Sequence, residues 1–167
     1  MAQNQSKVLL VDADMRRPRL HEAFKQKNNA GLSNFLSGQS KFEEVIKKTE
    51  IENLSLVCGG PYPPNPSELL SCHKMKEFIQ EAGKSDFDFI LFDMPPMMVV
   101  TDAVILSKSV DGTIIVLESG KTSKRVLPRV DKILKNAQAR VVGAILNRNP
   151  ITSDNYQYYN YYYGKTE

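Results

Sequence analysis

The chain has 167 residues, of which 41% are hydrophobic and 25% are charged. This size and balance predict one globular domain with a single core and argue against intrinsic disorder. The formal net charge of +3 is not concentrated in one helix or arm, so the composition gives no indication of a nucleic-acid-binding surface.

Strand and helix patterns alternate along most of the chain. Four continuous apolar runs predict strands at 7–14, 88–96, 112–119 and 140–148, and NLSLVCGG predicts a weaker one at 53–60. Helical spacing predicts helices at 21–25, 40–48, 66–82, 102–107 and 123–137. In the last of these segments, 123–137, we expect the helix to begin near Pro128. The alternation predicts a doubly wound α/β fold, with strands buried on both faces of a mostly parallel sheet.

The predicted sheet forms one unit, residues 1–150, and a flexible tyrosine-rich tail follows at 151–167. Cys58 and Cys72 form no Cys-x-x-Cys pair, so we expect buried or incidental thiols in a reducing compartment. The N-terminal residues MAQNQSK lack the apolar stretch of a signal peptide. These features lead us to expect a cytoplasmic protein.

Three aspartates end apolar runs: Asp12 and Asp14 follow the first, and Asp93 follows the run that begins at residue 88. Ligands of open α/β sheets bind outside the carboxyl ends of the strands, so these side chains should share one edge. A single aspartate here is equally well explained as a turn residue or helix N-cap. Three together favour Mg²⁺, which typically takes one or two carboxylates, waters and phosphate oxygens.

Three motifs occur in a chain that ends in a tyrosine cluster: VDADMRRP at 11–18, PNPSELLS at 64–71 and ILFDMPP at 90–96. The first and third resemble the Walker A′ and Walker B motifs of the bacterial tyrosine kinases (BY-kinases), and the second is similar to another segment of that family. The tyrosine cluster is the family's hallmark. The resemblance covers nearly the whole chain and implies a P-loop NTPase sheet of the MinD/ParA-like type.

The resemblance also implies roles for individual residues. Asp12 and Asp93 would hold Mg²⁺, Asp12 directly and Asp93 through water. Asp14 would accept the proton of the attacking tyrosine, whose free pKa of about 10 makes it a poor nucleophile at neutral pH. Asn147 and Arg148, at the end of the last strand, would bind the nucleotide, although Asn147 is equally well explained as a turn residue.

Arg16 and Arg17 have two explanations, as solvated charges at a helix start or as contacts to a phosphate or a neighbouring subunit. The implied phosphoacceptors are Tyr156, Tyr158, Tyr159, Tyr161, Tyr162 and Tyr163. Six phosphates would add roughly −9 to −12 charges, which could break a ring of subunits held together by docked tails. The alternative is a tail that is merely adhesive or prone to aggregation.

The chain departs from the family in one respect, because it contains no Gly-x-x-x-x-Gly-Lys-[Ser/Thr] loop to cradle phosphates. Two Gly-Lys-[Ser/Thr] triplets, at 83–85 and 120–122, have Phe78 and Ile115 where the first glycine belongs. We hypothesise an N-terminally truncated kinase domain that lacks the P-loop strand and helix. Since that strand lies inside the family's sheet, we expect a gap, lower stability and self-association.

The implied function is an ATP-dependent protein-tyrosine kinase, a transferase that autophosphorylates its tail and regulates capsule or exopolysaccharide synthesis and export. The implied partners are a tail of its own or of a neighbouring subunit in a ring homo-oligomer, a membrane activator of the chain-length regulator type, and a cognate phosphotyrosine phosphatase. The implied location is the inner face of the cell membrane, reached through that activator. Two alternatives remain: a non-catalytic phosphoacceptor module, since the P-loop is absent, and a partitioning-type ATPase.

Overall fold

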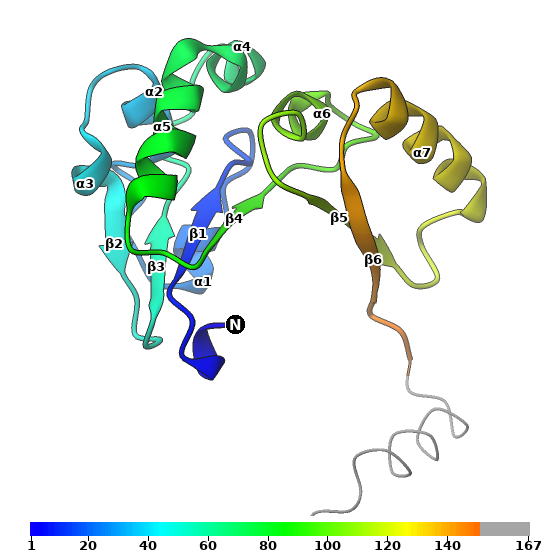
Figure 1. Cartoon of the computed structure of the whole chain (residues 1–167), viewed down its shortest axis with the longest axis horizontal. Coiled ribbons are helices and arrows are strands. Elements are labelled where there is room, and N and C mark those ends of the chain that lie inside the picture. Colours follow the sequence, from blue (N-terminus) through cyan, green and yellow to red (C-terminus); the bar gives the residue numbers. More distant parts are fainter. Residues whose placement is uncertain (151–167) are drawn as a thin grey trace, which may run out of the picture.

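The computed structural model describes residues 1–150, and their strands form two separate sheets (Figure 1). The larger sheet has the order β2-β3-β1-β4, and the smaller pairs β5 with β6. All neighbouring strands run parallel except β2, which is antiparallel to β3. The strands are β1 Val8–Asp12, β2 Ile46–Lys48, β3 Leu54–Val57, β4 Phe89–Asp93, β5 Thr113–Glu118 and β6 Val141–Asn147. The predicted α/β fold with a mostly parallel sheet is confirmed.

The helices between these strands are short. They are η1 Ala2–Asn4, α1 Leu20–Ala23, α2 Leu32–Leu36, α3 Phe42–Val45, α4 Pro66–Ser71, α5 His73–Lys84, α6 Asp102–Leu106, η2 Lys124–Val126 and α7 Leu127–Asn136. Helix α7 has Pro128 in its first turn, as predicted. Within residues 1–150, no helix combines the length and the apolar character needed to cross a membrane.

The prediction of one helix over 66–82 is wrong, because the chain breaks at Cys72 into α4 and α5. Cys72 is extended, with φ −75° and ψ 166°, and it is the N-cap residue of α5. The apolar positions Leu70 and Met75 are five residues apart, whereas one continuous helical face needs three or four. The break lets both helices bury an apolar side.

Both cysteines are free thiols, and Cys58 is buried.

The prediction of a helix over 40–48 is only half right. Helix α3 ends at Val45, and Ile46 turns extended to begin β2, where it pairs with Val57 of β3. Pairing with a distant strand overrides the local helical pattern here. Sequence analysis also missed α2, a five-residue helix that buries Leu32 and Phe35.

The core lies between the four-stranded sheet and helices α2, α3, α4 and α5. Phe78 of α5 is fully buried at its centre, with ring centroids of Phe35 and Phe42 each 5.3 Å away. Phe92 of β4 meets the same ring edge-on at 6.2 Å. These edge-to-face contacts tie β4 to the helical layer.

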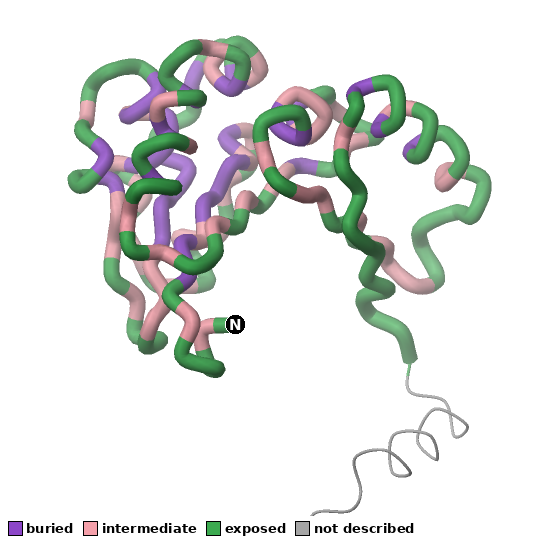
Figure 2. The backbone as a smooth tube through the Cα atoms, viewed as in Figure 1, coloured by how far each residue is buried: buried purple, intermediate pink, exposed green. Residues whose placement is uncertain are grey.

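The expectation of strands buried on both faces holds for β1 but not for β4, β5 or β6. Buried segments gather around β1 and β3, whereas β6 is exposed along its whole length (Figure 2). In β4 and β5, Leu91 and Val116 are 37% and 63% exposed. No ladder joins β4 to β5 within residues 1–150, so the apolar side chains of these strands lack the neighbour that would cover them. Within residues 1–150 the two sheets are therefore not joined.

Candidate active site

Two of the predicted carboxylates lie side by side at the carboxyl edge of the four-stranded sheet. Asp12 ends β1, Asp93 ends β4, and the two are register partners in the parallel ladder. Asp12 is 1% exposed, and its Oδ2 accepts hydrogen bonds from the backbone N–H groups of Arg19 and Leu20, each at 3.0 Å. Its Oδ1 is buried and has no hydrogen-bond partner among the described residues. One oxygen therefore orders the following loop, and the other is free for a ligand.

Both carboxylates are less acidic than an ordinary aspartate. Burial raises the pKa of Asp12, the charges of Asp93 and Asp14 raise it further, and the hydrogen bonds from Leu20 and Arg19 act in the opposite direction. Burial also raises the pKa of Asp93, with an added contribution from the charge of Asp14. Asp12 is buried whereas Asp93 is exposed, so the cost of burying charge falls mainly on Asp12, and a bound cation would relieve that cost.

These residues fit Mg²⁺ as part of its coordination shell. The buried, unpartnered Oδ1 of Asp12 and the adjacent carboxylate of Asp93 are hard oxygen ligands. Among residues 1–150, no group of three or more side chains could hold a metal ion by itself. Magnesium typically keeps several waters and takes phosphate oxygens from its substrate, so two protein carboxylates suffice.

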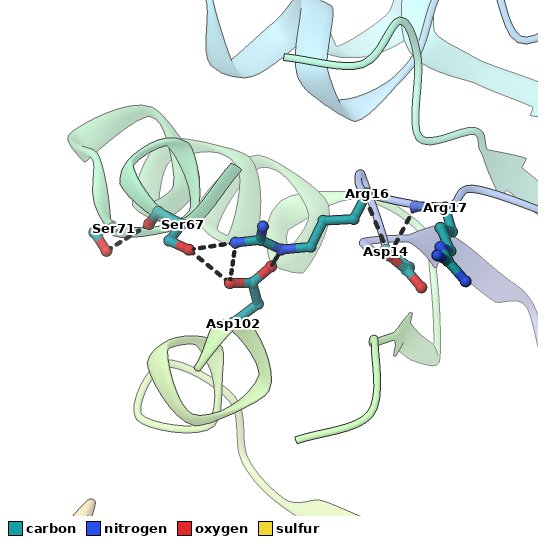
Figure 3. A network of polar contacts seen from close by, with 6 residues as sticks. All are labelled: Asp14, Arg16, Arg17, Ser67, Ser71 and Asp102. Carbon is teal, nitrogen blue, oxygen red and sulfur yellow. Dashed lines mark hydrogen bonds and ion pairs between the residues drawn. The ribbon is translucent and has the colours of Figure 1, made fainter. Parts of the chain in front are cut away.

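Asp14 lies two residues beyond Asp12, in the turn that follows β1 (Figure 3). Its Oδ1 accepts hydrogen bonds from the backbone N–H groups of Arg16, at 3.2 Å, and Arg17, at 3.0 Å. Its Oδ2 accepts none from the residues that the structure describes. The structure therefore brings Asp12, Asp14 and Asp93 together, as the sequence predicted.

The side chain of Arg16 points away from this edge toward α4 and α6 (Figure 3). Its Nε donates to Oδ2 of Asp102 at 2.8 Å, and one terminal nitrogen donates to Ser67 Oγ at 2.8 Å. Ser67 in turn donates to Oδ1 of Asp102 at 2.7 Å. We call Arg16, Ser67 and Asp102 the arginine clamp. Arg16 is paired with Asp102 and is therefore not a solvated charge, while contact of Arg16 or Arg17 with a phosphate or a neighbouring subunit stays a prediction.

The sequence gives neither Ser67 nor Asp102 a role in the site. PNPSELLS is recognisable from sequence only as a family motif, and Asp102 only as the start of a helix. An aspartate in the first turn of a helix is common because it favours the helix dipole, so nothing local distinguished it.

Asn147 and Arg148 lie on the other sheet, at the end of β6. Oδ1 of Asn147 accepts the backbone N–H of Arg148 at 2.8 Å, and the Arg148 guanidinium pairs with Glu118 at 2.8 Å. Among residues 1–150, no hydrogen bond or ion pair joins either residue to the three aspartates. Nucleotide binding by this pair stays a prediction. The six predicted phosphoacceptors, Tyr156 to Tyr163, lie outside the described residues.

Comparison with known proteins decides the family. A model of the AAA domain family matches residues 1–147. A putative tyrosine-protein kinase of Staphylococcus aureus, CapB, is 38% identical over 164 residues, which cover 98% of this chain and 71% of the relative. The chain belongs to the family of bacterial tyrosine-protein kinases. The crystal structure of the chimerical protein CapA2B2 agrees, with a TM-score of 0.84 and 36% identity over 89% of this chain.

The kinase family shares its fold with a wider class. The cell division ATPase MinD of Pyrococcus furiosus has a TM-score of 0.73 and 25% identity over 91% of this chain. The predicted MinD-like fold is thus confirmed, with lower identity than for the kinases. The chain spans 66% of the CapA2B2 chain and 63% of the MinD chain.

Proposed function

We propose that this chain is part of an ATP-dependent protein-tyrosine kinase that phosphorylates tyrosines of its own C-terminal cluster and regulates capsule or exopolysaccharide synthesis. The observation that carries the proposal is the convergence of Asp12, Asp14 and Asp93 on one sheet edge in a member of the tyrosine-kinase family. Kinase chemistry depends mostly on positioning and charge stabilisation, and this edge supplies three fixed carboxylates.

The proposed step is an in-line displacement at the γ-phosphorus of ATP. The phenol oxygen of a tyrosine forms the new P–O bond, the bond to the β,γ-bridging oxygen breaks, and ADP leaves. The phenol proton passes to the free Oδ2 of Asp14, which has no competing donor among the described residues. Asp12 and Asp93 would hold Mg²⁺, which when bound neutralises developing charge on the phosphate oxygens.

We also propose that an additional strand, carrying a phosphate-binding loop, completes the sheet between β4 and β5. A cleft of about 510 Å³ is lined by residues of both strands, including Leu91, Phe92, Ile114 and Val116. Unpaired edges and apolar side chains on both sides favour an extended, uncharged segment. A strand there would end beside Asp93, and a loop after it would deliver backbone N–H groups and a lysine to the phosphates.

The finer parts of the proposal come from the family resemblance. They are a ring of subunits that exchange tyrosine tails, a membrane activator of the chain-length regulator type, a phosphotyrosine phosphatase, and a location at the inner face of the cell membrane. The carboxylates of the aspartate edge would repel a tail that carries several phosphates.

The test is incubation of the chain with Mg²⁺ and γ-labelled ATP, alone and with an intact kinase of the family, followed by mapping of phosphate on Tyr156 to Tyr163. On a chain completed by the additional strand and its loop, the proposal expects label in the absence of the intact kinase, and this label is lost in Asp14→Asn. Label that persists in Asp14→Asn would remove that residue from the mechanism.

A second candidate is a non-catalytic phosphoacceptor module. It is favoured by the absence of a Gly-x-x-x-x-Gly-Lys-[Ser/Thr] loop from the 167 residues. In that case, label appears only when the intact kinase is present, and Asp14→Asn in this chain does not reduce it.

A further inference from the structure

The arginine clamp joins three segments that are distant in the sequence. Arg16 lies in the turn after β1, Ser67 in α4, and Asp102 at the start of α6, 86 positions beyond Arg16. Asp102 is 1% exposed, and the side chain of Arg16 is 32% exposed. The guanidinium binds both carboxylate oxygens, at 2.8 Å and 3.2 Å, which fixes the plane of the arginine as well as its position.

The clamp acts on the same backbone that orients Asp14. The N–H groups of Arg16 and Arg17 both donate to Oδ1 of Asp14, and the side chain of Arg16 runs in the opposite direction into the clamp (Figure 3). Residue 16 is therefore held at two points, by its side chain on α4 and α6 and by its N–H on Asp14. The side chain of Arg17 is exposed and makes no hydrogen bond within residues 1–150.

We propose that Arg16 is a positioning residue, anchored by Asp102 and Ser67, that holds two backbone N–H groups on Oδ1 of Asp14 and so leaves Oδ2 free toward a phenol. The proposed kinase chemistry is the reason this orientation matters, and in that respect the inference rests on the proposed function. It also gives the PNPSELLS segment a role, because that segment supplies Ser67.

Amide hydrogen exchange of the full chain tests the clamp without any need for activity. Loss of the anchor in Arg16→Ala should speed exchange of the amides of residues 16 and 17 by about tenfold or more, the factor expected when hydrogen bonds to a charged group are lost. Arg17→Ala is the matched control, since it removes a neighbouring arginine that the clamp does not use. It should leave the amide of Arg16 at its wild-type rate.

A second variant separates local positioning from overall stability. Arg16→Ala leaves the buried Asp102 charge unpaired, which can destabilise the whole fold. The double variant Arg16→Met with Asp102→Leu removes both charges, so the amides of Leu9 and Val11 in β1 should return to wild-type rates while those of residues 16 and 17 stay fast. Wild-type exchange at residues 16 and 17 in this double variant would overturn the proposal, as would equal acceleration throughout β1.

The kinetics of phosphoryl transfer distinguish a positioning role of Arg16 from a purely structural one. In a chain that transfers phosphate, Arg16→Lys should lower kcat and leave the KM for ATP unchanged. The lysine keeps the charge but cannot bind Asp102 through two nitrogens, so Asp14 would be held less firmly. A change in KM alone would contradict positioning of Asp14. If phosphate transfer is absent even when the chain is completed by the additional strand and its loop, the proposed function fails, and the exchange rates still decide whether the clamp holds the turn.

Discussion

Asp12 and Asp93 are paired residue for residue across β1 and β4, so two carboxylates leave the sheet at the same level. Burial raises the pKa of each. A carboxylate whose pKa is raised by folding lowers the stability of the folded state at neutral pH, because its charged form is better solvated in the unfolded chain. The two charges therefore lower stability at neutral pH, and a bound cation would offset this effect.

The first prediction concerns Asp93→Asn, which removes one of these charges. In the absence of metal, this variant should melt at a higher temperature than the wild type, since an unfavourable charge is gone. Mg²⁺ at a hundredfold excess over its Kd should stabilise the wild type by about 2.7 kcal/mol and the variant by much less. Thermal melts with and without Mg²⁺ measure both effects. Asp131→Asn, on the exposed face of α7, is the control, and an equal Mg²⁺ shift in all three proteins would remove Asp93 from the metal site.

The second prediction concerns the pH dependence contributed by Asp102. Burial acts to raise its pKa, but hydrogen bonds from Arg16 and Ser67 and the charge of Arg16 prevail, so the pKa lies below the ordinary value of 3.8. A depressed folded-state pKa contributes stability that is complete above the unfolded value and is lost as the pH falls through the folded value. Asp102→Asn should therefore lower the free energy of unfolding by about 1–3 kcal/mol at neutral pH, and by progressively less in acid. The loss is kept to this range because the side chain of its partner, Arg16, is partly exposed.

Urea denaturation of the wild type and Asp102→Asn across this pH range measures the difference. Asp131→Asn again serves as the control, because its ion pair with Lys135 is exposed on both sides and should contribute little at any pH. A stability difference for Asp102→Asn that does not shrink in acid would mean that packing, and not charge, accounts for it.

The third prediction concerns the aromatic centre of the core. Phe78→Ala should cost about 3–5 kcal/mol, because the ring is fully buried and three other phenylalanine rings surround the space it would leave. Phe89→Ala removes the same ring from β4, where it is 42% exposed, and should cost about 1 kcal/mol or less. Chemical denaturation compares the two, and similar losses would mean that Phe89 is covered in solution.

The aspartate edge could be predicted from sequence because its rule is local. An aspartate that ends an apolar run of a parallel sheet must lie at the carboxyl edge, and this placed Asp12 and Asp93 correctly. The arginine clamp could not be predicted in this way. Arg16 and Asp102 are 86 positions apart and come together only in the folded chain. Neither residue lies in a local sequence pattern that would indicate its partner.

In the smaller sheet, the strands could be predicted from sequence but their burial could not. The sequence correctly predicts β5 and β6 as strands but not their exposure. An apolar run indicates that a strand is suited to burial, and it does not show whether neighbouring segments cover it. Val116 and Ile145 are 63% and 51% exposed within the described chain. The mismatch between apolar sequence and exposed structure marks the surface on which the proposed additional strand would pack.

The fourth prediction follows from that mismatch. Unpaired edges on β4 and β5, lined by apolar side chains, should make the chain associate with itself at high concentration. Lysine at Leu91 or Val116 places a charge in the cleft and should suppress this association, and it should also abolish binding of an added apolar peptide strand. Val116 is 63% exposed, so Val116→Lys should change the stability of the isolated chain by only about 0.5 kcal/mol, whereas Leu91→Lys, at a side chain that is 37% exposed, should cost about 1 kcal/mol.

Sedimentation velocity measures the association, and Val99→Lys is the matched control. Val99 is 77% exposed but does not line the cleft, so its substitution adds the same charge to the same kind of side chain elsewhere. Suppression by all three lysines would indicate a general effect of net charge. A wild-type chain that stays monomeric and melts sharply at high temperature would contradict an open sheet. Suppression by Leu91→Lys and Val116→Lys alone would assign the association to the cleft, because only there can an incoming strand pair with β4 and β5 together.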